Sequence, residues 1–382
     1  MRRTTTVAVL LGAVAGIVLA GGCSGGSAAE PSTPTTPRPT GVVLPSPAST
    51  TAAGATDRGL PPLPAGWTDD EITFVSAGVT VHGTLRHPVG GPSVPGALLI
   101  AGSGPTDRDG NSPLIAGKVD SLKAVAGWLA QAGVASLRYD KLGSGATGLG
   151  RYATDPAAID VAAFAGEARD ALSYLASRPG IDPDRLSVYG HSEGGLFALQ
   201  LATQATAPAV RAVGLLEPLS RRYLDLISRQ IHDQVAAATA AGSMTAADGD
   251  RLLQALTAAI AQLRASGTVP ADLPAALATV FNPSSLTFLQ QMDTIDPVEL
   301  ARTLPAAFPV LLTCSDADIQ ISCEDVDQLA TGLTTTRLDL VKLTGVSHVL
   351  KQDPSRSPAN YGAALPFSPR LGDALVAFAR TG

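Results

Sequence analysis

The order of apolar and polar positions predicts alternating strands and helices over most of the chain. Two short stretches at 73–76 and 79–85 alternate in polarity, which predicts an antiparallel hairpin. Residues 97–101 are all apolar, as expected of a central strand in a parallel sheet. Apolar residues at helical spacing over 122–129 precede Gly133, so we expect a helix that ends there.

The alternation continues toward the middle of the chain. Residues 134–139 have a strand pattern, and Asp155 with Pro156 is typical of the start of a helix, here one that runs to about Leu175. A further strand at 186–190 is followed by a helix that is apolar nearly all round. Strands that alternate with helices in this way indicate an α/β fold with a largely parallel, doubly wound sheet.

After a strand at 212–216, the segment 217–304 has helix patterns and no convincing strand pattern. Thr245 and Asp248 resemble a capping box at the start of one of these helices. Strand patterns return afterwards, at 309–313 and 338–343. A helical insertion in such a sheet is most simply a cap over a substrate site; the alternative is a packing element away from the site.

The N-terminus has the pattern of an export signal. Arg2 and Arg3 precede an apolar run at 7–20, and the sequence up to Cys23 resembles the lipobox of bacterial lipoproteins. That resemblance implies that residues 1–23 are a lipoprotein signal peptide and that Cys23 carries the lipid. An ordinary cleaved signal peptide and an uncleaved anchor are the alternatives. We expect an exported protein held at the extracytoplasmic face of the cell envelope.

Residues 24–66 are rich in Pro, Ser, Thr, Gly and Ala. Such a segment cannot bury enough apolar surface to offset its ordering entropy, so we expect a disordered tether. The folded domain is then predicted over 67–382, with 217–304 as its helical insertion.

The composition excludes several functions. The 382 residues have a formal net charge of −6 and 4% aromatic residues, and basic residues do not cluster beyond the N-terminus. These values argue against nucleic acid as a partner. Neither a metal-ligand spacing nor a phosphate-binding loop is recognisable, so we expect no cofactor.

The candidate nucleophile is Ser192, in the sequence Gly190-His-Ser-Glu-Gly194. A strand precedes this G-x-S-x-G pattern and a helix follows it, which suits a serine held on a sharp turn. The flanking glycines allow the neighbouring chain to pack closely. A second match at Gly22–Gly26 lacks both the strand and the helix, so we reject it.

His348 is the candidate general base because it lies in a loop after the strand at 338–343. A serine, an acid and a histidine in this chain order can form a catalytic triad. The other histidines fit less well. They are His82 and His87 in the hairpin, His191 next to the nucleophile, and His232 in the helical segment.

The region from Trp67 to the C-terminus resembles the α/β-hydrolase superfamily, and within it bacterial esterases and serine-aminopeptidase-like hydrolases with a Gly-Ser-Gly-Pro-x-Asp-Arg-Asp-Gly segment. The resemblance rests on five motifs in order. These are 101–110, 138–145, the turn at Ser192, 315–318 and 345–348. It implies an eight-stranded, mainly parallel sheet flanked by helices, with an all-helical cap inserted after the sixth strand.

The resemblance also implies roles for individual residues. The family's acid follows a glycine by three positions; Ser315 stands at that place here, which points to Asp318 and leaves Asp316 as the alternative. The backbone N–H groups of Ser103 and Glu193 would form the oxyanion hole.

We further expect structural ion pairs beside the site. The residues concerned are Asp107, Arg108, Asp109, and Asp140 with Lys141.

These assignments predict a carboxylesterase that acts on a small-molecule or lipid ester through an acyl-enzyme. A peptidase, amidase or acyltransferase with the same triad is a second hypothesis. A non-catalytic binding lipoprotein of the envelope is a third. The protein's other partner would be the membrane, reached through the lipid anchor.

Cys314 and Cys323 bracket the predicted acid loop. If Cys23 is lipidated, the three cysteines leave one pair, and an exported protein can keep a disulfide. We therefore expect a Cys314–Cys323 bridge; two buried thiols are the alternative.

Overall fold

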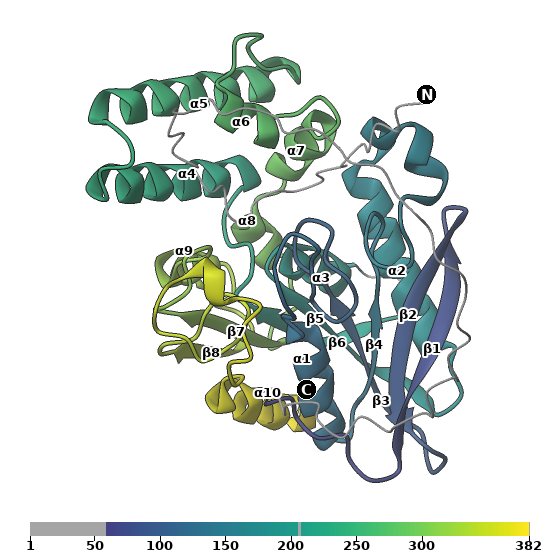
Figure 1. Cartoon of the computed structure of the whole chain (residues 1–382). Coiled ribbons are helices and arrows are strands. Elements are labelled where there is room, and N and C mark those ends of the chain that lie inside the picture. The colour runs from purple at the N-terminus through teal and green to yellow at the C-terminus, as the bar shows by residue number, and fades with distance from the viewer. Residues whose placement is uncertain (1–58, 205–207, 382) are drawn as a thin grey trace, which may run out of the picture.

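An eight-stranded sheet forms the centre of the computed structural model, which describes residues 59–204 and 208–381 (Figure 1). The strand order is β1-β2-β4-β3-β5-β6-β7-β8. β2 is antiparallel to both of its neighbours, and the other pairs are parallel. The predicted mainly parallel sheet is therefore confirmed. The strands are β1 Trp67–Ser76, β2 Val79–Pro88, β3 Val94–Ile100, β4 Ala135–Tyr139, β5 Ile181–His191, β6 Val210–Leu216, β7 Pro309–Ser315 and β8 Arg337–Leu343.

Helices cover both faces of this sheet (Figure 1). Successive residues of a strand point to opposite faces, so Leu98 packs with one apolar cluster and Leu99 with the other. The Leu99 cluster includes side chains of α1 (Ser121–Gln131) and α10 (Pro369–Thr381). The Leu98 cluster includes α2 (Val161–Ala176), α3 (Glu193–Thr203) and α9 (Cys323–Ala330).

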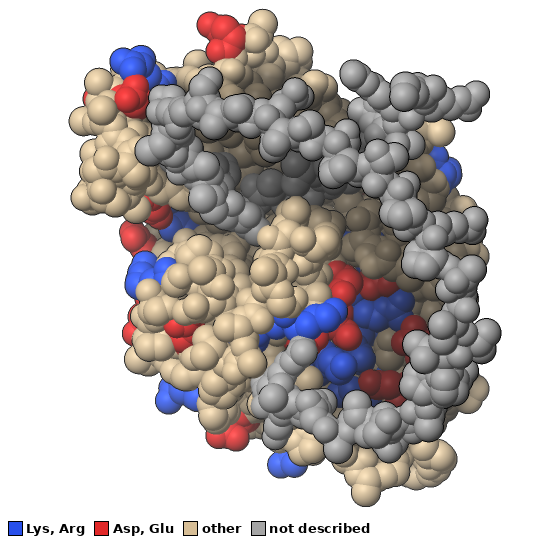
Figure 2. Space-filling model, in the orientation of Figure 1, with Lys and Arg blue, Asp and Glu red and all other residues tan. Residues whose placement is uncertain are grey.

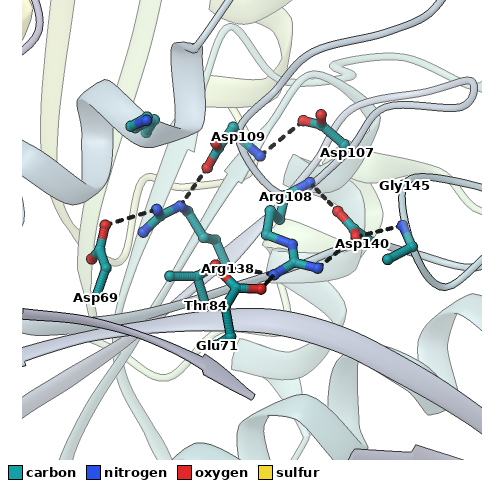
Figure 3. Close-up of a pocket in the computed structure, with 11 residues that line it drawn as sticks. Asp69, Glu71, Thr84, Asp107, Arg108, Asp109, Arg138, Asp140 and Gly145 are labelled. Atoms are coloured by element: carbon teal, nitrogen blue, oxygen red, sulfur yellow. Dashed lines mark hydrogen bonds and ion pairs between the residues drawn. The ribbon is translucent and has the colours of Figure 1, made fainter. Parts of the chain in front are cut away.

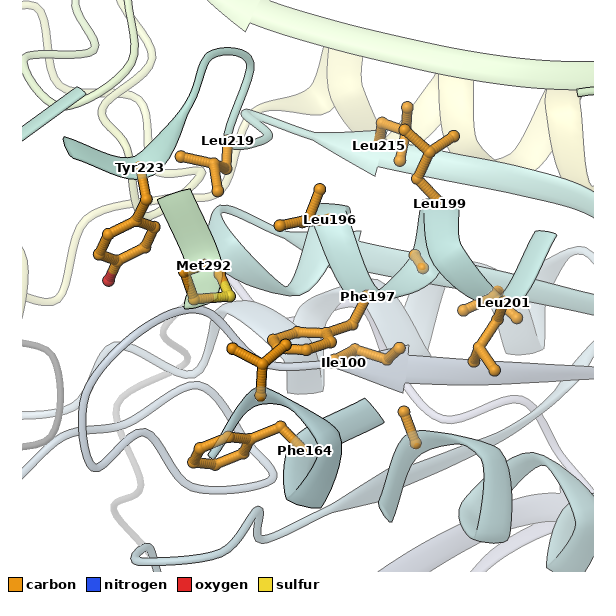
Figure 4. Close-up of a cluster of buried hydrophobic side chains, with 14 of the residues drawn as sticks. Ile100, Phe164, Leu196, Phe197, Leu199, Leu201, Leu215, Leu219, Tyr223 and Met292 are labelled. Carbon is orange, nitrogen blue, oxygen red and sulfur yellow. The ribbon is translucent and has the colours of Figure 1, made fainter. Parts of the chain in front are cut away.

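α3, the helix that follows the candidate nucleophile, is almost fully enclosed (Figure 4). All of its residues except Gln200 and Thr203 are buried. Phe197 lies near Phe164 of α2, with ring centres 6.2 Å apart. The sequence prediction of a helix that is apolar nearly all round is confirmed. A helix enclosed in this way holds its first residues, and the turn before them, in one position.

Five helices and no strand occupy the described chain between β6 and β7. Thr245 caps α5, since its hydroxyl accepts a hydrogen bond from the N–H of Asp248 at 3.1 Å. The same helix ends at Gly267, whose φ of 72° is in the left-handed region. The five helices are α4 Tyr223–Ala240, α5 Ala246–Ser266, α6 Ala275–Val280, α7 Leu286–Asp293 and α8 Pro297–Ala301. In Figure 1, α4 and α5 run side by side and project away from the sheet.

The predicted start of α2 was wrong. Asp155 and Pro156 begin a single 3₁₀ turn, and Ile159 after it is extended. The α-helix begins at Val161, because Asp160 is the residue whose side chain accepts a hydrogen bond from Ala163 N, at 2.9 Å. Because Ile159 is extended, the helix takes its cap from Asp160, five positions after Asp155.

The structure places the end of the predicted tether on the domain. Leu60 packs against the apolar cluster of α1 and α10. Pro61 lies so close to Gly127 of α1 that a Cβ there would be 2.8 Å from the proline ring. The contact depends on a glycine far away in sequence, so local composition could not reveal it. The signal peptide, Cys23 and the rest of the tether lie outside the described residues.

Within the described part of the chain, none of the helices combines the length and the apolar character that a membrane span requires.

Glu167 of α2 is a buried acid, 3% exposed, that accepts a hydrogen bond from Leu142 N at 3.0 Å. Its burial raises its pKa to about 8. Between the ordinary pKa of 4.5 and about 8 the folded protein binds a proton that the unfolded chain releases. The free energy of unfolding therefore falls as the pH rises through this window, by up to about 1.4 kcal/mol per pH unit.

We expect Glu167→Gln to remove this pH dependence while keeping an acceptor for Leu142. Urea unfolding at pH 5 and pH 8 should show the variant gaining several kcal/mol relative to the wild type at the higher pH. If the variant and the wild type differed by the same free energy of unfolding at both pH values, the raised pKa would be contradicted.

Candidate active site

Ser192 lies on a sharp turn between β5 and α3. Its φ of 55° and ψ of −124° are unusual for a residue with a side chain, so the turn is strained. Two backbone hydrogen bonds hold it: Ser192 N donates to Leu216 O at 3.0 Å, and Gly195 N donates to Ser192 O at 2.9 Å. The serine is half-buried.

Glycines make this turn possible by close approach. A Cβ on Gly190 would lie 2.1 Å from the carbonyl oxygen of Gly194, and one on Gly194 would lie 2.3 Å from that of Ile100. Neither backbone atom can move without breaking the turn or β3. The two glycines of the motif are therefore required for the nucleophile's position.

The structure joins His348 to Asp318. His348 Nδ1 is 2.8 Å from Asp318 Oδ2, and both side chains are buried. The other carboxylate oxygen of Asp318 accepts hydrogen bonds from Gln320 N at 2.7 Å and Ile321 N at 3.1 Å. Burial opposes ionisation of Asp318, but His348 and these N–H donors together lower its pKa.

Asp316, the alternative acid, is exposed and contacts a different group. Its Oδ1 accepts a hydrogen bond from Gly345 N at 2.7 Å, which ties the loop of His348 to the end of β7. The structure therefore brings Asp318, and not Asp316, to the imidazole.

His191 packs against His348, with ring centres 4.8 Å apart. His191 Nε2 is 2.7 Å from the carbonyl oxygen of His348. Burial, with a smaller effect of His348, lowers the pKa of His191 to about 3. The ring is thus neutral at pH 7, and its Nε2–H donates to this carbonyl. Because His191 directly precedes Ser192, the contact places the loop of His348 next to the nucleophile's turn.

Glu217 is a fully buried acid at the end of β6, with a φ of 46°. Its N–H donates to Thr313 Oγ1 at 3.1 Å, and its carboxyl group lies next to that of Asp318. Burial and the Asp318 carboxylate raise the pKa of Glu217 well above its usual range. The raised pKa favours the protonated form of Glu217 beside the Asp318 carboxylate.

The two residues predicted for the oxyanion hole come from adjacent loops. Glu193 is the first residue of α3, so its N–H has no partner in the helical ladder. Ser103 follows Gly102, which lies so close that a Cβ on it would be 3.0 Å from Ser192 Cβ. The structure thus brings both loops to the serine.

The predicted ion pairs form a network on β1, β2 and β4, visible as a hollowed charged area in Figure 2. Arg108 pairs with Asp140 at 2.8 Å and with Glu71 at 2.5 Å (Figure 3). Arg138 joins Asp109 at 2.7 Å. Residues of this network line a cavity of about 450 Å³ that includes neither Ser192 nor His348. The network therefore supports the loops beside the site.

Two residues that the sequence predicts for this ion-pair network have other partners in the structure. Among the described residues Asp107 has no ion-pair partner; its Oδ1 accepts hydrogen bonds from Asp109 N at 2.9 Å and Asn111 N at 2.8 Å. Lys141 does not join Asp140 and instead turns toward Glu193, at 3.5 Å. Consecutive residues after a strand point to opposite sides, which separates Lys141 from the network.

Cys314 and Cys323 form a disulfide that links the end of β7 to the start of α9. The loop it closes contains Asp318, and a loop of about ten residues should contribute about 3 kcal/mol in the chain-entropy model. We expect reduction under native conditions to lower activity before global unfolding, because Asp318 loses its support.

Two measurements test this bridge. Thiol titration of the denatured, unreduced protein should find neither cysteine free; two free thiols would show that the bridge does not form. As a control, the activity of the double variant Cys314→Ala/Cys323→Ala should not respond to reductant.

Sequence reasoning missed three residues of the site. The sequence predicts no role for His191 or Glu217, and it predicts an ion pair with Asp140 for Lys141. The one available signal was position: Lys141 and Glu217 come directly after parallel strands, whose carboxyl ends meet at one edge of the sheet. In the described part of the chain, no group of three or more His, Cys, Asp or Glu residues is arranged to hold a metal ion.

No family model matches the chain, and no curated protein matches it. Solved structures do. A complex of DcsB with its substrate analogue has a TM-score of 0.50 at 15% identity, over 82% of this chain and 99% of that one. The Pyrococcus furiosus esterase Pf2001 has a TM-score of 0.49 at 15% identity, over 83% of this chain and 96% of the esterase chain. The α/β hydrolase GrgF from Penicillium sp. sh18 has a TM-score of 0.47 at 18% identity, over 74% of this chain and 91% of the GrgF chain.

These low identities bear on the fold alone. The strand order, the antiparallel β2 and the strained turn between β5 and α3 define the α/β-hydrolase fold.

Proposed function

We propose that this chain is a serine hydrolase, and specifically a carboxylesterase, with Ser192, His348 and Asp318 as its triad. The observation that carries the proposal is the buried His348–Asp318 pair, at 2.8 Å, whose histidine contacts the residue before a serine on a strained strand-to-helix turn. A carboxylate on Nδ1 leaves Nε2 of the imidazole free to accept a proton. This arrangement suits removal of a proton from a serine hydroxyl.

In the proposed mechanism, His348 accepts the proton of Ser192 Oγ as this oxygen attacks the ester carbonyl. The N–H groups of Ser103 and Glu193 stabilise the resulting oxyanion. His348 then donates the proton to the leaving alcohol, and an acyl-enzyme forms on Ser192. Water, deprotonated by His348, releases the acid and restores the serine. Asp318 holds the imidazole and stabilises its protonated form throughout.

The segment α4–α8 would be the cap of this site. Tyr223, the first residue of α4, donates a hydrogen bond to Glu193 Oε2 at 2.8 Å, which supports placing the insertion's start beside the nucleophile. Residues of the insertion would then limit the size of the acyl group.

A substrate panel tests the function. The full-length protein is incubated with a short-chain p-nitrophenyl ester, the matching p-nitroanilide, and the ester with an added alcohol acceptor. A carboxylesterase hydrolyses the ester and leaves the anilide almost untouched. Faster anilide cleavage would indicate a peptidase or amidase, and transfer to the alcohol an acyltransferase. No turnover beyond that of Ser192→Ala would favour a non-catalytic lipoprotein.

We also propose that the protein is a lipoprotein of the cell envelope, anchored through Cys23. Two or more acyl chains give stable anchoring, whereas one gives only marginal binding. Cys23→Ala should therefore release the protein from the membrane fraction or block its processing, as a fractionation blot would show. Unchanged partitioning into detergent would reject the anchor and leave the hydrolase proposal unaffected.

A further inference from the structure

Lys141 is a buried lysine that the proposed mechanism does not use. It follows β4, and only 6% of the residue is exposed. Its ammonium group lies 5.7 Å from the centre of the Phe164 ring. A buried ammonium group is costly unless strong acceptors or opposite charges surround it. The partners of Lys141 therefore show where the fold uses this charge.

The first partner is the carbonyl oxygen of Gly102, to which Lys141 Nζ donates a hydrogen bond. This carbonyl belongs to the same peptide unit as the N–H of Ser103. A peptide unit is planar and almost always trans, so its carbonyl and its N–H point in opposite directions. Holding the Gly102 carbonyl therefore fixes the direction of the Ser103 N–H, one of the two oxyanion donors.

The second partner is the side chain of Glu193, whose N–H is the other donor. Lys141 Nζ is 3.5 Å from Glu193 Oε1, and the Tyr223 hydroxyl donates to Oε2 at 2.8 Å. Burial and the Glu193 carboxylate raise the pKa of Tyr223 well above its usual value, so its hydroxyl keeps the proton that it donates. The first residue of α3 is thus held from both sides.

We propose that Lys141 is a positioning residue that aligns both N–H donors of the oxyanion hole, one through the Gly102–Ser103 peptide and the other through Glu193. Tyr223 extends the same chain of contacts to α4. The inference rests on the proposed hydrolase function, since it assigns a role where an oxyanion develops. Lys141 itself touches neither the substrate nor the reacting atoms.

A lysine that only stabilised the fold would affect the kinetics differently from one that aligns oxyanion donors. Losing it would lower the amount of folded enzyme, and the folded molecules would keep their kcat. A residue that aligns oxyanion donors acts on the transition state, so its loss lowers kcat and leaves KM almost unchanged. It also weakens an inhibitor that forms a tetrahedral oxyanion on the serine, such as an alkyl trifluoromethyl ketone.

The test compares wild type with Lys141→Met in the full-length protein. Methionine keeps most of the length of the side chain and removes the charge. We expect kcat for a p-nitrophenyl ester to fall about 100-fold and the affinity for the trifluoromethyl ketone to fall by a similar factor. KM should change by less than about threefold. A folded Lys141→Met protein with kcat within about threefold of wild type would overturn the proposal.

Leu375→Ala is the matched control for stability. Leu375 is fully buried in α10, in the apolar cluster on the face of the sheet away from α3. This variant should lower Tm as Lys141→Met does, yet keep kcat and the inhibitor affinity. If Leu375→Ala lost kcat and inhibitor affinity as Lys141→Met does, lower stability would explain both losses, and the positioning role would be rejected.

Two milder variants decide the question if Lys141→Met does not fold. Glu193→Gln weakens the attraction to Lys141, and Tyr223→Phe removes one hydrogen bond from the same carboxylate. Each should lower kcat and inhibitor affinity together, by about fivefold for Tyr223→Phe. If neither variant changed either quantity, the proposal would fail. Loss of the hydrolase function would instead appear in the wild type, as an absence of turnover beyond that of Ser192→Ala.

Discussion

Ser192→Ala should abolish ester hydrolysis while leaving the fold intact. Without the hydroxyl no acyl-enzyme can form, and in serine hydrolases such a loss costs on the order of 10⁶-fold in kcat. The residue is half-buried on a turn whose backbone is held by its own hydrogen bonds, so the smaller side chain leaves no large cavity. Initial rates with a p-nitrophenyl ester, together with Tm, measure both parts of the prediction.

His348→Ala should have a comparable effect, because the serine then lacks a base. A fluorophosphonate probe separates the two variants: Ser192→Ala cannot be labelled, whereas His348→Ala can be labelled slowly. More than a small fraction of wild-type activity in either folded variant would refute the triad. Full labelling of Ser192→Ala would place the nucleophile elsewhere.

Asp318→Asn should lower kcat by about 10⁴-fold. An amide at this position can donate to Nδ1 and so favours the imidazole tautomer with its proton on Nε2, which cannot accept the proton of Ser192. The variant nearly preserves the shape of the side chain. The acceptor for Gln320 and Ile321 can also remain, so the local loop should keep its structure.

Asp316→Asn is the matched control, two residues away in the same loop. Its side chain can still accept the hydrogen bond from Gly345, and we expect activity within about threefold of wild type. Both variants are assayed under the same conditions with the same ester. The reverse ranking would move the triad acid to Asp316.

Much of the sheet could be predicted because each strand has a local signature. The all-apolar residues of β3 and the strand-turn-helix pattern around Ser192 depend on neighbours within a few positions. The order of serine, acid and histidine then named Ser192 and His348 directly. The choice between Asp316 and Asp318 needed the resemblance, since both are close enough in sequence to serve.

Other features could not be predicted because they depend on burial and direction. Lys141 and Asp140 are consecutive charged residues, yet Lys141 turns toward Glu193 and Asp140 pairs with Arg108. Glu217 is an ordinary glutamate in the sequence, and its pKa is raised because the fold buries it beside Asp318. The start of α2 was misplaced for a simpler reason, since Asp155 and Asp160 are equally good caps until the backbone between them is known.

The path of the chain from β6 to β7 has a consequence for how the substrate range can evolve. α8 packs against α3 and α9 and returns the chain to β7, so it serves as the crossover that a parallel pair requires. Helices α4–α7 form the part of the insertion that precedes α8. Insertions and deletions among them can accumulate without shifting the β6–β7 register, so selection could remodel the proposed cap while the proposed triad stays unchanged. Tyr223 limits this freedom, because its contact with Glu193 ties the first turn of α4 to the proposed oxyanion hole.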